Sequence, residues 1–354
     1  MNRNRGSARA AAIFVALLAA PPASAGTPPQ EDPEPSLAIS GLLFGDIYAV
    51  TNHHLEDAAG SFGGWVRRAY LTADSTSGDG WFARIRLEAN QSGEFESYRF
   101  RVDFKDLHVG LAAGDHRVIA GLSPTPTFDL VETYWGLRYL EKTPLDLQGV
   151  ASRDTGLSAR GPLALDGALR YRAMVGAGIG FGTESGDGYK FMGAVSWEFS
   201  AGWIIDAYSS HERRPGATDR FTVQGFLGRR SPRVRFGLLY ANQDRQSDPP
   251  LEVASVFLVW RLGRIASLVG RIDRLLEPSP RGADIDYLPF DPTARATLLL
   301  GALEFQMGDS VRLTPGLEVI SYDVSAATGQ RPATDTILRL TAFWRSAPSL
   351  WRTH

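Results

Sequence analysis

The chain has 354 residues, no cysteine and a formal net charge of −2. Without cysteine it can form neither a disulfide scaffold nor a thiolate metal site. The slightly acidic balance also argues against a nucleic-acid binder, which is normally clearly basic.

The N-terminal segment predicts export. Three arginines at positions 3, 5 and 9 precede the apolar run Ala10 to Ala20 and the small-residue site Ala23-Ser24-Ala25, which is the pattern of a cleavable secretory signal peptide. The run is shorter than the roughly 20 apolar residues of a spanning helix. We predict a signal peptide over 1–25, a Pro-rich and acidic, disordered periplasmic tail over 26–36, a folded region over 37–346 and a C-terminal extension over 347–354.

The folded region repeats one pattern, in which apolar and polar residues alternate over about ten positions and a turn follows. In the clearest case, one face of the strand carries Trp81, Ala83, Ile85 and Leu87, and the other face carries Arg84, Arg86 and Glu88. The pattern predicts about sixteen strands, near 37–50, 63–74, 80–91, 98–111, 116–122, 154–162, 167–179, 189–200, 202–212, 218–230, 232–243, 251–262, 264–276, 292–306, 310–323 and 334–345.

The connections between these strands alternate in length. Short turns are predicted at 76–80, 112–115, 162–166, 201, 231–232, 263 and 308–309, and longer loops at 52–62, 91–97, 123–153, 180–188, 211–217, 244–250, 277–291 and 324–333. Bacterial barrels keep short turns on the periplasmic side and long loops outside, and they have an even number of strands. We therefore predict an all-β, antiparallel up-and-down transmembrane β-barrel in the cell outer membrane, with the lipid bilayer as its partner and the outer-membrane assembly machinery as its folding partner.

The connection 123–153 is much longer than the others and carries helix-compatible spacing in Leu130, Tyr134, Leu137 and Tyr139-Leu140. Long loops of this kind are usually functional. We expect it to fold inward with a short helix and to narrow the lumen; the alternative is a lid on the surface. The predicted constriction residues are Asp129, Glu132, Arg138, Glu141, Lys142, Arg153 and Asp154, with Asp146 among the charged set.

The same segment carries a family resemblance. The runs Pro124 to Phe128, Glu132 to Arg138 and Ser152 to Gly156, together with Arg67-Arg68-Ala69-Tyr70, resemble the porin O and P family, the phosphate- and pyrophosphate-selective outer-membrane porins. The resemblance covers about residues 60–180, and only the barrel pattern matches beyond them. It implies a homotrimer of sixteen-stranded channels with a basic lumen, passive diffusion of small anionic or polar solutes, and neither catalytic residues nor a cofactor.

The arginines bear independently on anion preference. Four strands contain an Arg-apolar-Arg triplet, which places both guanidinium groups on one face of a strand. Charges on the lipid face cost a few kcal/mol near the midplane, so these side chains should face the lumen. The predicted pore-lining basic residues are Arg84, Arg86, Arg99, Arg101, Lys105, Arg170, Arg172, Lys190, Arg233, Arg235 and Arg312, and Arg295 and Arg339 follow by the same parity.

Neutralisation across neighbouring strands is the competing interpretation of these arginines. The hairpin at 91–97 brings Glu88 beside Arg99 or Arg101 and Asp103 beside Arg86, so such residues could brace the wall rather than attract anions. A cluster near the periplasmic mouth has no evident acidic partner; it consists of Arg229, Arg230, Arg233 and Arg235.

Three other functions stay open: an outer-membrane enzyme, a barrel that sheathes an electron-transfer partner, and a soluble exported β protein. No metal site is predicted, because adjacent residues such as His53 and His54 point to opposite faces of an extended chain. The last alternating strand ends at Phe343-Trp344, and Pro348 should bar its simple continuation.

Overall fold

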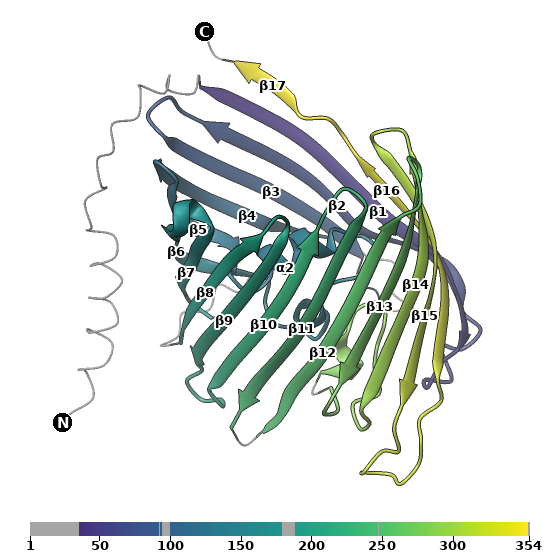
Figure 1. The fold of residues 1–354 in the computed structure, drawn as a ribbon. Helices are drawn as coiled ribbons and strands as arrows, with labels where there is room; N and C mark the ends of the chain where they lie inside the picture. The colour runs from purple at the N-terminus through teal and green to yellow at the C-terminus, as the bar shows by residue number, and fades with distance from the viewer. Residues whose placement is uncertain are drawn as a thin grey trace, which may run out of the picture. The chain divides into compact units, whose positions relative to one another are not determined.

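The computed structural model describes residues 35–91, 93, 100–178, 188–246, 248–279 and 281–352. The predicted signal peptide and Arg99 lie outside these residues. The described strands form one closed antiparallel barrel, in which each strand pairs with its neighbours in the sequence (Figure 1). The predicted fold class is therefore confirmed.

Sixteen strands build the wall, and their order in the sheet follows the chain. They are β1 (Ser36–Asn52), β2 (Phe62–Thr76), β3 (Trp81–Gln91), β4 (Phe100–Ala113), β5 (His116–Pro124), β6 (Arg153–Ala164), β7 (Leu169–Gly176), β8 (Tyr189–Ser200), β9 (Trp203–Arg213), β10 (Arg220–Arg230), β11 (Val234–Arg245), β12 (Asp248–Arg261), β13 (Ala266–Leu275), β14 (Ala296–Met307), β15 (Val311–Tyr322) and β16 (Asp335–Arg345).

A further short strand, β17 (Ser349–Arg352), lies where the sequence predicts a C-terminal extension. It pairs with the beginning of β1, from Ser36↔Arg352 to Ile39↔Ser349, just beyond the last pair of β1 with β16, Leu42↔Arg345. The register shifts by one residue between the two sets, so β17 continues β16 after a bulge that contains Pro348. Proline has no N–H to donate to a ladder and is tolerated at such a bulge.

The outer surface of the wall is apolar. Exposed Ile47, Ile85 and Leu338 lie in the middle of their strands, and their neighbours in the sequence face inward. Exposed aromatic side chains mark both ends: Trp81, Trp197, Trp260 and Trp344 at the short-turn end, and Phe62, Phe100 and Phe221 at the long-loop end. An apolar band between two aromatic girdles is the lipid-facing surface of an outer-membrane barrel. None of the described helices has the length and apolar character of a membrane-spanning helix.

The connections alternate in length, with one difference from the prediction. The loop predicted at 244–250 shrinks to two residues, because β11 runs to Arg245 and β12 already begins at Asp248. Arg245 and Asp248 pair across the turn, so both strands are longer than predicted. The added residues are mostly polar, and the alternation of polar and apolar residues does not assign them to a strand.

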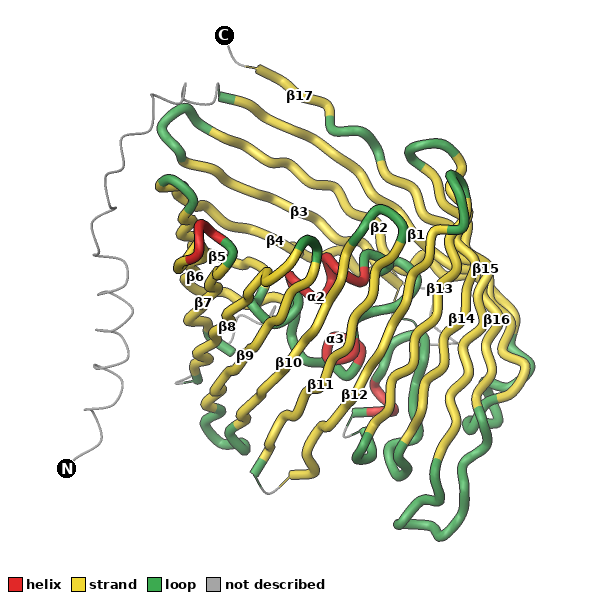
Figure 2. Tube along the Cα trace, viewed as in Figure 1, coloured by secondary structure: helices red, strands yellow, loops and turns green. Residues whose placement is uncertain are grey.

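Two of the long connections fold into the barrel. The β5–β6 connection, Thr125 to Ser152, carries α2 (Asp129–Trp135) and α3 (Pro144–Leu147), which lie inside the ring of strands (Figure 2). The β13–β14 connection, Leu276 to Arg295, carries the 3₁₀ turn η2 (Gly282–Asp284) and buries Tyr287, Leu288 and Phe290. We call these connections the constriction loop and the second inward loop. The inward fold predicted for the first is seen, while that of the second is not evident from the sequence.

Candidate functional site

The constriction loop is held against one side of the barrel by an apolar contact. Trp135, 1% exposed, meets the ring of Phe257 edge-on at 5.1 Å, Tyr134 meets Phe226 at 5.6 Å, and Tyr139 packs on Phe343 at 4.6 Å. The inward faces of β10 to β16 therefore combine apolar residues that pack on the loop, such as Phe226 and Phe257, with buried polar ones, such as Gln224 and Glu318.

A buried network of ions, which we call the anchor network, ties the same loop to the wall. Glu141, 1% exposed, lies 3.4 Å from Arg67 and 3.3 Å from Arg339. Arg67 also donates to the carbonyl of Leu140 at 2.8 Å, and Arg339 lies 2.9 Å from Glu318. Buried charges are tolerated only when paired and hydrogen-bonded, so this arrangement fixes the loop at one position.

The second inward loop closes over the anchor network from the long-loop side. Tyr287 donates its hydroxyl proton to the carbonyl of Gln91 at 2.6 Å, and its ring lies 5.1 Å from the guanidinium of Arg67. Near the beginning of the same loop, Ser279 donates to Gln148 of the constriction loop at 2.6 Å. The two inward loops thus brace each other.

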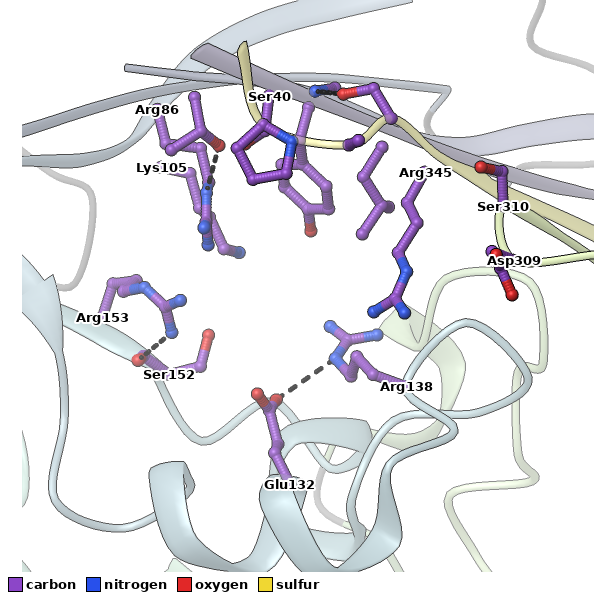
Figure 3. Close-up of a pocket in the computed structure, with 17 residues that line it drawn as sticks. Ser40, Arg86, Lys105, Glu132, Arg138, Ser152, Arg153, Asp309, Ser310 and Arg345 are labelled. Atoms are coloured by element: carbon purple, nitrogen blue, oxygen red, sulfur yellow. Dashed lines mark hydrogen bonds and ion pairs between the residues drawn. The ribbon is translucent and has the colours of Figure 1, made fainter. Parts of the chain in front are cut away.

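A cavity of about 620 Å³, which we call the eyelet cavity, lies between the constriction loop and strands β1 to β4. Figure 3 shows Arg86, Lys105 and Arg153 on its wall side, facing Glu132 and Arg138 of the loop across an open centre. Arg138 is held by Glu132 at 3.3 Å and by Asp146 at 2.8 Å. The eyelet thus has a basic wall opposite a loop of mixed charge.

A bulge in β4 places an acid in this wall that alternation does not reveal. The register between β3 and β4 shifts so that Arg86 faces Asp106 and Leu87 faces Phe104, which leaves Lys105 extra. Lys105 and Asp106 are therefore both buried toward the lumen. Asp106 lies 3.2 Å from Arg86 and 2.6 Å from Arg153. Parity along the sequence assigns Asp106 to the outer face, which is wrong.

Most of the predicted pore-lining cations have acidic partners. The pairs are Arg84–Asp74 at 2.6 Å, Arg86–Asp106 at 3.2 Å, Arg101–Asp103 at 2.7 Å, Lys105–Glu88 at 3.2 Å, Arg172–Asp206 at 2.7 Å, Lys190–Glu212 at 3.4 Å and Arg312–Glu304 at 3.2 Å. Neutralisation within the wall is thus extensive, although Asp103 pairs on its own strand instead of with Arg86. Among the described residues, Arg170, Arg233 and Arg235 form no ion pair.

The remaining constriction residues occupy different surroundings. Asp129 pairs with Arg160 at 3.2 Å beside the lumen, and Lys142 lies 3.5 Å from Asp286 of the second inward loop. Glu141 belongs to the buried anchor network. Asp154, 1% exposed, accepts backbone N–H groups of Thr155 and Gly178, both at 2.9 Å, and so braces β6 rather than lining the open eyelet.

Two more cavities lie at the short-turn end. One, of about 480 Å³ between β5 and β9, is lined by Arg117, Arg160, Arg170 and Arg172 with Asp115 and Asp129. The other, of about 510 Å³ between β10 and β15, is lined by Arg230, Arg233, Arg235, Arg261, Arg264 and Arg312 with Glu304, and we call it the arginine recess. The eyelet cavity is lined by five basic and two acidic side chains, and the β5–β9 cavity by four basic and two acidic ones. The arginine recess is lined by six basic side chains and one acidic one.

Several of these lining residues are missed by the sequence reasoning. Arg160 has the correct parity within β6 but stands alone, without the triplet that marks the other strands. Arg117, Arg261, Arg264 and Arg345 lie at strand ends or turns, where basic residues are ordinary surface residues. These four residues come to lie around the same lumen only because the barrel closes.

His53 and His54 do not point to opposite faces as the sequence predicts. The rings of His53 and His54 stack at 4.5 Å and both approach Asp335, because the chain leaves extended geometry after Asn52. His54 Nδ1 lies 2.9 Å from the Asp335 carboxylate, and the N–H of Leu55 donates to His53 Nδ1 at 3.0 Å. In this arrangement the proton of neutral His53 is on Nε2, which therefore cannot ligate a metal there. The cluster links loop 53–61 to β16.

Burial perturbs two titratable groups of the constriction loop. The pKa of Glu132 is raised by burial and by nearby Asp146, against the opposing effect of Arg138. Burial lowers the pKa of Lys142, and Asp146 and Asp286 oppose this effect. Both shifts favour the neutral forms, and Glu132 lines the eyelet cavity, so the charge that Glu132 presents to the eyelet depends on pH.

No protein-family model matches the chain, and no curated protein matches it in sequence. Solved structures match in fold. The anion-selective porin from Comamonas acidovorans has a TM-score of 0.65 at 14% identity, covering 88% of this chain and 100% of that one. OmpF of Salmonella typhi, solved with daunomycin, gives 0.61 at 11% identity, covering 88% and 97%. The outer-membrane channel DcaP of Acinetobacter baumannii gives 0.58 at 9% identity, covering 88% and 98%.

These likenesses show that the chain has the barrel fold of outer-membrane porins and channels. They do not confirm membership of the porin O and P family in particular. The closed barrel, its apolar outer band and its two girdles are those of an outer-membrane protein.

Proposed function

We propose that the chain is an outer-membrane porin through which small polar solutes diffuse passively, and that its pore prefers anions, including phosphate-like solutes. One observation carries the anion preference: fifteen basic side chains (five, four and six) and five acidic ones line the three cavities at the short-turn end. A water-filled lumen in a low-dielectric wall concentrates the field of such an excess and raises the local concentration of anions.

The geometry of the wall supports oxyanions as solutes. Guanidinium groups bind the oxygens of phosphate and carboxylate through paired N–H donors. Arg86 and Arg153 face the open centre of the eyelet cavity, and Arg160 and Arg172 continue the basic surface around the barrel.

The two inward loops bear on the alternative functions. A barrel that sheathes a partner protein needs a lumen wide enough for that partner, whereas here both inward loops pack within the ring of strands. We propose a channel without catalytic residues or a bound cofactor. We also propose that three copies assemble through their outer walls and are inserted by the outer-membrane assembly machinery; the similar OmpT of Vibrio cholerae, at 11% identity and a TM-score of 0.59, is described in a trimer form.

The test is the reversal potential of single channels in a planar bilayer under a potassium chloride gradient, followed by titration of phosphate into chloride. Wild type should give a reversal potential of anion sign, and phosphate should lower the chloride conductance. The variant Arg117→Glu/Arg170→Glu changes two basic residues of the β5–β9 cavity that have no ion pair among the described residues. It should move the potential toward cation preference.

A matched control changes charge at the opposite end of the barrel. Arg331 is exposed in the β15–β16 connection, and Arg331→Glu should shift the potential much less. A folded barrel without conductance would refute the porin function, and conductance without anion preference would refute the selectivity alone.

A further inference from the structure

The arginine recess differs from the other two cavities in the balance of its charges. Six arginines line it, contributed by β10, β11, β12, β15 and the turns between β10 and β13, and Glu304 is the one acidic residue among its lining. In the eyelet cavity and the β5–β9 cavity, salt bridges to Asp106, Asp129 and Asp206 offset much of the positive charge.

Five of the six arginines have no acidic partner. Within the part of the chain that the structure describes, Arg312 alone is paired, with Glu304 at 3.2 Å, while the others form no ion pair and donate no side-chain hydrogen bond. The unpaired set is Arg230, Arg233, Arg235, Arg261 and Arg264. Like charges gathered in one recess repel each other, and this repulsion is relieved when an anion binds.

The inner part of the recess is pre-arranged. The guanidinium of Arg312 lies 5.8 Å from the ring centre of Tyr139 and 5.3 Å from that of Phe343. The guanidinium of Arg235 lies against Gly136, in the space that a Cβ atom there would occupy. Arg312 is thus held by two rings and Arg235 is half-buried beside the loop, whereas the remaining four are exposed at the rim and free to adjust to a ligand.

The recess lies beside the eyelet and not in it. Glu132 of helix α2 lines the eyelet cavity, while Gly136, at the C-terminal end of the same helix, lies against Arg235 of the recess. The two spaces adjoin at the turn between β14 and β15, where Ser310 lines the eyelet cavity and Arg312 lines the recess. The recess is bordered by the short turns after β10 and β12, so it opens toward the short-turn side of the barrel, which corresponds to the periplasm in bacterial barrels.

We propose that the arginine recess is a binding site for a multivalent, phosphate-bearing anion that enters from the short-turn side. Five unpaired guanidinium groups exceed what a monovalent anion can neutralise, and a chain of phosphates presents enough oxygens for paired N–H donors from several arginines. The site stands beside the pathway, so the inference goes beyond the proposed anion preference. Occupation would place negative charge under the eyelet and lower its anion current.

The experiment uses tripolyphosphate as the probe in a planar bilayer of neutral lipids. A single cysteine introduced by Gln330→Cys and labelled with an impermeant thiol reagent reports which side carries the long loops, since Gln330 is exposed and the natural chain has no cysteine. Tripolyphosphate on the short-turn side should reduce the chloride current in a saturable way. On the opposite side, a higher concentration should be needed.

The decisive variant removes the four rim charges by Arg230→Gln, Arg233→Gln, Arg261→Gln and Arg264→Gln. Because these side chains are exposed and unpaired, the barrel should fold normally, and the blocking concentration should rise at least about tenfold with the loss of four charge-assisted contacts. The matched control Arg117→Gln/Arg170→Gln lowers basic charge at the same end of the barrel outside the recess, and should leave the block within about twofold.

A phosphate group could also come from a lipid headgroup. Titration of the protein with tripolyphosphate in non-ionic detergent, without lipid, separates these sources: saturable binding that the four-arginine variant loses supports a site for soluble anions. Its absence, or a block that the variant retains, would overturn the inference. If the wild type prefers anions but tripolyphosphate blocks it equally from both sides or not at all, the proposed binding site is refuted, while the proposed porin function stands.

Discussion

Replacing Glu141 by Gln tests whether the anchor network fixes the constriction loop. The substitution keeps the shape of the side chain and removes a buried charge that lies 3.4 Å from Arg67 and 3.3 Å from Arg339. Loss of one member of a buried ion pair costs about 3–5 kcal/mol. Here each arginine keeps a second carboxylate, Asp46 at 3.4 Å for Arg67 and Glu318 at 2.9 Å for Arg339, so we expect about 2–3 kcal/mol by the same principle.

The assay is hydrogen exchange of the loop amides, because undocking of the loop is a local event that need not unfold the wall. The amides of Leu147 and Val150 donate to carbonyls within the loop at 2.8 and 2.9 Å and report its order. A cost of about 2–3 kcal/mol should accelerate their exchange about 30- to 150-fold. Asp129→Asn, which breaks the half-exposed pair with Arg160, is the control and should accelerate it less than about fivefold. Equal acceleration in both variants would refute the anchoring role.

Three further predictions concern the eyelet. Protonation of Glu132 removes a negative charge as pH falls through its raised pKa, so anion preference should increase from neutral toward acidic pH in reversal-potential measurements, and Glu132→Gln should abolish this step. Gly136→Ala forces a positive φ of 64° on a residue with a Cβ atom and displaces the guanidinium tip of Arg235, and should destabilise the loop by about 1–2 kcal/mol, read from the same amide exchange. Asp106→Asn leaves Arg153 without its carboxylate partner, and should strengthen anion preference while lowering the free energy of unfolding in urea by about 3–5 kcal/mol.

Strand positions were predictable because each strand has one face in lipid and one toward the lumen, which imposes strict alternation on the sequence. Regions such as Trp81 to Gln91 show this directly, with exposed Trp81 and Ile85 on one face and Arg84 and Arg86 on the other. A bulge breaks the argument. At Lys105 the count of residues shifts by one, and the rule then misplaces Asp106, the acid that pairs with two eyelet arginines.

The lumen was less predictable than the wall because its contents depend on contacts between distant segments. The second inward loop is an ordinary long connection in sequence, yet Tyr287 reaches Gln91 across the barrel. The arginine recess likewise combines the turn at 231–233 with Arg264 and Arg312, far apart in the chain. Local pattern reveals which residues are charged and which face they occupy, but which cations are neutralised depends on the register between strands, as the pairs Arg86–Asp106 and Arg172–Asp206 show.

The pairing of β17 with the start of β1 has a consequence for biogenesis. Ser36, at the beginning of β1, pairs on one side with Thr76 of β2 and on the other side with Arg352 of β17. Until that end arrives, the first strand presents an unsatisfied edge of N–H and C=O groups, which cannot be left in lipid and invites pairing with another chain. The edge of β1 therefore has to be shielded until β16 and β17 arrive, and a chain without β17 would leave Ser36 to Ile39 unpaired on one side.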